Sequence, residues 1–146
     1  MARYTGTILT SKPAEDVYDY MADFRSVEQW DETVTEAKLI GNQQPGKGAR
    51  YSVTFKLAGR ENTFEYETLE AERPHRILLR AESGSVVSLD QITVREVAEG
   101  TELTYDAKLE PKGLMKVTDP ALGLLFKRLG DNAAKGLARE LDGQVT

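Results

Sequence analysis

Apolar residues recur along the chain with two different periods, and the period indicates which kind of element each segment forms. A period of two is clearest over 50–57 and again over 63–67, where every second residue is polar. Such alternation predicts β-strands with one buried face and one solvated face. The turn residues at 58–61 separate these segments, so the pair is predicted to form an antiparallel hairpin.

Strands are also predicted in five further segments, each rich in alternating or β-branched residues and most of them bounded by Gly or Pro. These segments are 3–10, a stretch that starts at Val34, 77–81, 86–97 and 102–109. Six or seven strands in one antiparallel meander, with one polar face, account for this pattern.

Helices are predicted where the apolar period changes to three and four. Two short ones are expected over 14–21, after Pro13, and over 24–29. The longest is expected over 120–142, with Asp119 as its N-cap. A helix of that length measures about 34 Å at 1.5 Å per residue, so it must cross most of the molecule.

The relative widths of the sheet and the long helix predict a cavity. Six strands span about 29 Å at 4.8 Å spacing, whereas one helix is about 10–12 Å wide, so the sheet has to curl around the helix. Small inward residues, Ala81 and Ala107, stand beside aromatic ones and leave room between sheet and helix. The sequence leaves an alternative open, in which the same side chains interdigitate completely and no cavity forms.

Composition and charge exclude several classes of function. The 146 residues suit a single domain over 1–146, and they include no Cys and a single His, His75. Cysteine chemistry, Cys-based zinc sites and multi-histidine metal sites are therefore excluded, and neither a metal nor a cofactor is expected. The net charge of −5 opposes binding to nucleic-acid phosphates and to anionic membranes.

The apolar segments also bear on location. No apolar run is long enough to span a bilayer, and the first residues lack the apolar centre of a signal peptide. A cytoplasmic protein without stable membrane insertion is therefore expected. Residues 41–48 match a phosphate-binding loop except at Gly48, but a strand rather than a helix is predicted to follow, so these glycines are interpreted as a turn.

Several short motifs, spread over nearly the whole chain, resemble one family. They are SKPAEDVY at 11–18, Trp30-Asp31, PGKGARY at 45–51, YETLEAERP at 66–74, Asp90, GTELTY at 100–105 and the amphipathic terminal helix. In these motifs the chain resembles the START-like helix-grip (SRPBCC) superfamily, and within it the bacterial polyketide cyclase/dehydrase and lipid-transport family. The resemblance implies an α+β helix-grip fold, with two short helices after the first strand and a curved antiparallel sheet around the C-terminal helix. It also implies a site between the sheet and that helix.

The residues expected to line this site lie on inner strand positions and on one face of the terminal helix. The predicted ligand-binding residues are Tyr51, Val53, Phe55, Phe64, Tyr66, Leu79, Asp90, Ile92, Tyr105, Leu122, Phe126 and Leu129. The three tyrosines can offer their hydroxyls to a ligand, or they can be core residues whose hydroxyls find a backbone or water partner.

Asp90 is the one candidate for acid–base catalysis. Strand alternation places it on the inner face together with Ile92 and Val94. A carboxylate at that position can orient a ligand or move a proton. The alternative is a structural carboxylate that is hydrogen-bonded to backbone or hydroxyl groups.

Four other features have simpler interpretations. Trp30 is expected to anchor the short helices to the sheet, and His75 to face water in a turn. Glu65 and Glu67 are expected on the solvated face. The apolar residues in 114–117 are interpreted either as a mobile gate or as a packed connection.

The sequence thus predicts a carrier or sensor that binds a hydrophobic or amphipathic small molecule, such as a lipid or a polyketide-like compound. The alternative, which the resemblance implies, is a cyclase or dehydratase that folds a polyketide-like chain in the same cavity. Such an enzyme needs placed acid–base groups, and the sequence offers only Asp90 and the tyrosines for that role. An accessory protein with a protein partner needs an exposed apolar patch, which the alternation does not indicate.

Overall fold

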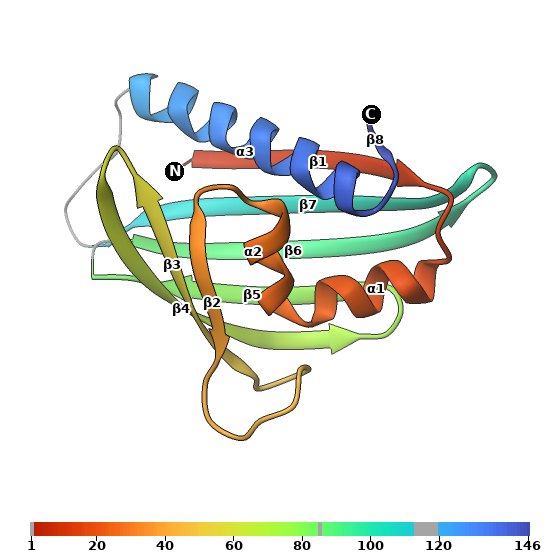
Figure 1. Cartoon of the computed structure of the whole chain (residues 1–146), viewed down its shortest axis with the longest axis horizontal. Helices are drawn as coiled ribbons and strands as arrows, with labels where there is room; N and C mark the ends of the chain where they lie inside the picture. Colours follow the sequence, from red (N-terminus) through yellow and green to blue (C-terminus); the bar gives the residue numbers. More distant parts are fainter. Residues whose placement is uncertain (1, 85, 113–119) are drawn as a thin grey trace.

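Eight strands form a single antiparallel sheet in the computed structural model, which describes residues 2–84, 86–112 and 120–146 (Figure 1). The strands are β1 (Ala2–Thr10), β2 (Val34–Leu39), β3 (Arg50–Leu57), β4 (Arg60–Glu72), β5 (Arg76–Glu82), β6 (Val86–Val97), β7 (Gly100–Pro111) and β8 (Gln144–Val145). Their order across the sheet is β2-β3-β4-β5-β6-β7-β1-β8. The long strands from β2 to β7 follow one another as a meander, as predicted, and β1 pairs with β7.

The C-terminal part of the chain differs from the sequence prediction in two ways. The predicted six or seven strands become eight because β8, which pairs with β1 at Ile8 and Leu9, has two residues and so shows no period. The terminal helix, α3 (Pro120–Glu140), ends before the predicted Asp142, because Asp142 takes a left-handed φ of 51°. The backbone N–H of Gly143 then bonds to the carbonyl of Ala138 at 2.8 Å, which closes the helix.

The β3–β4 hairpin turns on fewer residues than predicted. Only Ala58 and Gly59 form the turn, with φ values of 50° and 79°. Arg60 and Glu61, which the sequence assigns to the turn, pair with Leu57 and Lys56 in the ladder. Two successive positive φ values match the right-handed twist of the flanking strands, so the hairpin is tight and its strands run to its tip.

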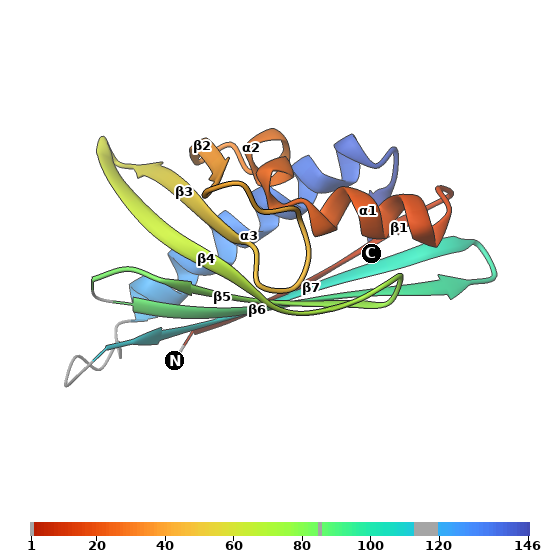
Figure 2. The same ribbon diagram turned by 90° about the horizontal axis from the view of Figure 1, so that it is seen from below.

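All the helices of the described chain lie on one face of the sheet, and the sheet bends toward them (Figure 2). They are α1 (Ala14–Ala22), the 3-10 helix η1 (Phe24–Ser26), α2 (Val27–Trp30) and α3. The hairpin of β3 and β4 rises out of the plane of β5, β6 and β7 beside these helices. This bending is the curvature that the narrow helix layer was expected to require, and it gives the α+β helix-grip arrangement predicted from the sequence.

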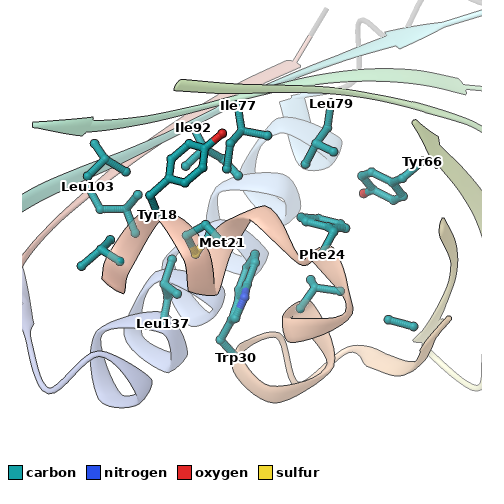
Figure 3. Close-up of a cluster of buried hydrophobic side chains, with 14 of the residues drawn as sticks. Tyr18, Met21, Phe24, Trp30, Tyr66, Ile77, Leu79, Ile92, Leu103 and Leu137 are labelled. Atoms are coloured by element: carbon teal, nitrogen blue, oxygen red, sulfur yellow. The ribbon is translucent and has the colours of Figure 1, made fainter. Parts of the chain in front are cut away.

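A close-packed core fills the space between α1, the C-terminal half of α3 and the sheet. Figure 3 shows Met21 of α1 and Leu137 of α3 facing the sheet residues Ile92 and Leu103. Each of these four side chains is at most 1% exposed. This end of the molecule has the solid interior that the sequence left open as an alternative.

The N-terminal half of α3 is much less buried than its C-terminal half. Leu124 and Leu125 are 62% and 47% exposed. Phe126 and Leu129 are half-buried. Asp119, the expected N-cap, and the proposed gate at Leu114, Met115 and Val117 lie outside the described residues.

Glycines fix the position of α3 on the other elements. A Cβ on Gly136 would overlap the backbone carbonyl of Trp30, and a Cβ on Gly130 would overlap the ring of Tyr4. Both glycines therefore allow closer approach than any other residue could. The helix is held close to α2 and β1 at these two points.

Candidate functional site

A cavity of about 370 Å³ lies between the N-terminal half of α3, the segment around α2 and the bent sheet. Its lining comes from β1, η1, α2, β3, β4, β6, β7 and α3, and most of it is apolar. The β3–β4 hairpin contributes Phe55 and Phe64, whose rings meet edge to face with centroids 5.5 Å apart. The half-buried Phe126 and Leu129 of α3 cover the opposite side.

Seven of the twelve sequence-predicted site residues line this cavity, and four do not. The seven are Phe55, Phe64, Tyr66, Asp90, Tyr105, Phe126 and Leu129. The four outside the lining are Tyr51, Val53, Leu79 and Ile92. The side chain of Leu122 lies outside the described part of the chain.

The four residues outside the lining belong to the solid core instead. Each points to the inner face, as the alternation predicts, and each is at most 1% exposed. Tyr51 donates a 3.4 Å hydrogen bond to the carbonyl of Ala22, the last residue of α1. Leu79 and Ile92 lie on β5 and β6 in the close-packed cluster of Figure 3. The period of a strand fixes the face of a residue but not its distance along the strand from the cavity.

Asp90 is the most buried polar group of the site, with 4% of its surface exposed. Its Oδ1 accepts a 2.6 Å hydrogen bond from the hydroxyl of Ser88, and its Oδ2 accepts a 2.5 Å hydrogen bond from that of Tyr105. Burial raises the pKa of Asp90, although these two donors act in the opposite direction. The carboxyl group is therefore held in place by hydroxyls, as the structural interpretation predicts, and it also faces the cavity.

Tyr66 and Tyr105 bring two phenols to the same region. Burial is the main cause that raises the pKa of each well above its ordinary value, and the charge of Asp90 adds to it. The Tyr66 hydroxyl makes no hydrogen bond to any residue that the structure describes, although its side chain is only 6% exposed. Ala107, the strand partner of Asp90, lines the cavity as expected, whereas Ala81, the strand partner of Tyr66, is fully buried outside the lining.

Asp31 is a second carboxyl group in the lining, and the sequence reasoning did not identify it as a site residue. It follows α2 directly, and its Oδ1 accepts hydrogen bonds from the backbone N–H of Thr33 at 2.9 Å and from the Thr33 hydroxyl at 2.7 Å. Burial raises the pKa of Asp31, against the effect of these bonds. The charge on Asp31 contributes a little to the raised pKa of Tyr66, and both residues line the same cavity.

No Lys, Arg or His is found among the described residues that line the cavity. The ion pairs that the structure describes, such as Arg3 with Asp106 and Arg73 with Asp19, involve neither Asp31 nor Asp90. The polar groups of the cavity are therefore carboxyls, hydroxyls, an amide and the indole N–H of Trp30, whose Nε1 is buried and has no hydrogen-bond partner among the described residues. The two carboxyls favour ligand groups that donate hydrogen bonds.

The other residues considered in the sequence lie away from the cavity. His75 is exposed in the turn before β5, as predicted. On the outer face of β4, Glu65 is exposed and Glu67 is half-buried. Residues 41–48 lead into β3 and not into a helix. Trp30 is 5% exposed and lies edge-on to Phe24, so it anchors α2 as expected, but it also lines the cavity.

The model of the polyketide cyclase/dehydrase and lipid-transport family matches residues 1–142. The chain belongs to this family. Comparison with curated protein sequences gave no significant match. The family assignment agrees with the resemblance inferred from the motifs, and it covers the cavity-lining residues on every element.

Solved structures share the fold of this family member at low sequence identity. A START superfamily protein from Mycobacterium smegmatis has a TM-score of 0.78 at 14% identity, over 97% of this chain and 98% of its own. The Zhui aromatase/cyclase from Streptomyces sp. R1128 has a TM-score of 0.73 at 14% identity, over 97% and 92%. Major latex-like protein 151 from Panax ginseng has a TM-score of 0.72 at 9% identity, over 96% and 97%. These likenesses establish the fold.

In the described ranges of this family member, no helix combines the length and the apolar character that crossing a bilayer requires.

The cavity joins an apolar enclosure to a few fixed acceptors, which is the usual construction of a small-molecule site. Tyr4 completes its wall from β1, where its hydroxyl donates a 2.9 Å hydrogen bond to Asp131 of α3.

Proposed function

We propose that the protein is a cytoplasmic carrier or sensor that binds a hydrophobic or amphipathic small molecule, such as a lipid or a polyketide-like compound. The observation that carries this proposal is the apolar cavity of about 370 Å³ under the N-terminal half of α3. Ligand pockets in proteins usually measure about 300–1,000 Å³. Protein interiors are close-packed and contain few voids larger than a water molecule. An apolar cavity of this volume therefore supports a binding site for a ligand.

Apolar burial would supply most of the affinity. Each 100 Å² of ligand surface removed from water contributes about 2.5 kcal/mol. The aromatic side chains of Phe55, Phe64 and Phe126 offer that contact, because all three are half-buried around the cavity. The hydroxyls and carboxyls on the sheet side would fix the orientation of the ligand rather than its affinity.

Mass spectrometry of the gently purified protein tests the proposal directly. A retained small molecule that is lost on denaturation is the expected result. The variant Ala107→Phe adds a ring to a cavity-lining position on β7, and it should abolish retention. Lys108→Phe adds the same ring at the next residue of β7, outside the cavity lining, and it should leave retention unchanged. Equal retention in both variants would contradict the assignment.

A second candidate function is a cyclase or dehydratase that works in the same cavity. It is favoured by the buried carboxyl of Asp90, which accepts a 2.5 Å hydrogen bond from the Tyr105 hydroxyl, and by the Tyr66 hydroxyl, which lines the same cavity and has no hydrogen-bond partner among the described residues. A carboxyl whose pKa is raised by burial is suited to general acid–base catalysis. Conversion of a polyketide-like substrate that disappears in Asp90→Asn, while the substrate still binds, would favour this candidate over a carrier.

A further inference from the structure

The polar groups that face the cavity differ in how far their hydrogen-bonding capacity is used. Both oxygens of Asp90 already accept hydrogen bonds, from Ser88 and Tyr105. Oδ1 of Asp31 accepts two, both from Thr33, whereas Oδ2 of Asp31 accepts none from the residues that the structure describes. The two bonds from Thr33 fix the orientation of the Asp31 carboxyl group, so its free oxygen has a set direction.

A second group with unused hydrogen-bonding capacity lines the same cavity as Asp31. The Tyr66 side chain is 94% buried, lines the cavity, and has no hydrogen-bond partner among the described residues for its hydroxyl. In Figure 3 its ring faces Phe24, and the two ring centroids lie 4.7 Å apart. The Tyr66 hydroxyl therefore has hydrogen-bonding capacity that a ligand group in the cavity can use.

We propose that the ligand carries a protonated amine at its polar end, and that the amine binds between Oδ2 of Asp31 and the hydroxyl oxygen of Tyr66. This proposal rests on the proposed binding function and names the chemistry of the ligand for that site. An ammonium group donates several hydrogen bonds, and both of these oxygens can accept one. A single ligand nitrogen can thereby bond to both of these oxygens.

Charge and aromatic surroundings favour an amine over an acid. A buried ammonium group needs an opposite charge, and Asp31 supplies one. The rings of Phe24, Trp30 and Tyr66 surround this part of the cavity, and aromatic faces attract cations. A carboxylate ligand would meet two carboxyl groups and no basic side chain among the described lining residues. Fatty acids are therefore expected to be poor ligands.

Three probes that share one ring system test the proposal on the unmodified chain. The probes are 2-(1-naphthyl)ethylamine, 2-(1-naphthyl)ethanol and 1-naphthylacetic acid, compared by calorimetric titration at pH 7. The amine should bind at least about tenfold more tightly than the alcohol, and the acid at least about tenfold more weakly than the alcohol. Binding of the acid equal to or tighter than that of the amine would overturn the proposal.

Matched variants locate the effect at Asp31. Asp31→Asn keeps an oxygen acceptor for Thr33 but removes the charge, so it should reduce the preference for amine over alcohol from at least about tenfold to about onefold. Tyr66→Phe should reduce the preference about two- to fivefold. Glu32→Gln makes the same change of charge one residue away, at an exposed position outside the cavity, and should have no effect.

The outcomes separate this proposal from the function on which it rests. If the alcohol binds but the amine preference is absent, or if it persists in Asp31→Asn, the cavity is a binding site and the amine proposal is wrong. If none of the three probes binds with a Kd below about 1 mM, the binding function itself is contradicted.

Discussion

Tyr105 and Asp90 are joined diagonally across two neighbouring strands by the 2.5 Å hydrogen bond between the Tyr105 hydroxyl and Oδ2 of Asp90. In the register of β6 and β7, Asp90 pairs with Ala107, and Tyr105 pairs with Ile92. The ring of Tyr105 therefore reaches along the strand direction, over the space that the small side chain of Ala107 leaves. The same bond secures a buried carboxyl and shapes the floor of the cavity.

Removal of the two phenolic hydroxyls should have unequal effects on stability. Tyr105→Phe takes a donor from the buried carboxyl of Asp90, so it should lower the free energy of unfolding by about 1–3 kcal/mol. Tyr66→Phe removes a hydroxyl that has no partner in the described chain, so its effect should be below about 0.5 kcal/mol. Urea unfolding of both variants measures the difference. Equal losses would mean that the Asp90–Tyr105 bond adds no net stability.

The carboxyl of Asp90 should make stability depend on pH. Burial raises its pKa in the folded state, so the folded protein binds the proton more tightly than the unfolded chain does. The stability that comes from this group is present at low pH and is lost as the pH rises from the ordinary carboxyl pKa through the raised value. Above that window, ionised Asp90 destabilises the fold. Each tenfold difference in proton affinity corresponds to about 1.4 kcal/mol.

Asp90→Asn isolates this dependence. The amide can still accept one hydrogen bond and donate another, but it does not titrate. The measurement is urea unfolding of both proteins between pH 4 and pH 8. Asp90→Asn should gain stability relative to the unmodified protein as the pH rises, because only the unmodified protein has to ionise the buried carboxyl. The other titrating groups are the same in both proteins, so their effects cancel in the difference. A difference that does not change with pH, or that changes in the opposite direction, would show that the carboxyl is stabilised in its ionised form.

The sequence predicts the faces of the strands well, because the side-chain period of a strand depends on local backbone geometry alone. Asp90, Tyr66 and Tyr105 were placed on the inner face by that period, and the structure has them there. The strand period does not predict whether an inner-face residue lies at the cavity or in the core, because that depends on which helix covers each part of the sheet. Tyr51 and Leu79 have the same period but lie in the solid core.

Asp31 was missed for a related reason. It lies just after a four-residue helix, where no period exists, and its place in the cavity follows from the packing of α2 against α3. The sequence signal that could have identified it is the Trp30-Asp31 pair, which was noted for the family resemblance only. A polar residue directly after a buried tryptophan is held near the interior whatever its own polarity.

The close approach of α3 to α2 should make Gly136 sensitive to substitution. A Cβ at this position overlaps the carbonyl of Trp30, so Gly136→Ala should shift the helix and cost about 1–3 kcal/mol. Gly123 lies on the same helix with no atom within 4 Å of its would-be Cβ. Gly123→Ala should therefore be neutral or should stabilise by up to about 1 kcal/mol through helix propensity. Thermal unfolding of the two variants measures the contrast.

Substitution of one leucine in the core and one in the cavity lining should have different effects on stability and on binding. Leu103 is fully buried on β7 outside the cavity lining, so Leu103→Ala should cost about 2–5 kcal/mol. Leu129 on α3 is half-buried against the cavity, so Leu129→Ala should cost less than about 1.5 kcal/mol, because the side chain loses few packed neighbours. Leu129→Ala should nevertheless weaken the binding of an apolar fluorescent probe, whereas Leu103→Ala should leave binding by its folded fraction unchanged. A loss of more than about 2 kcal/mol in Leu129→Ala would mean that the region under the N-terminal half of α3 is packed as tightly as the core, and that no ligand is needed to fill it.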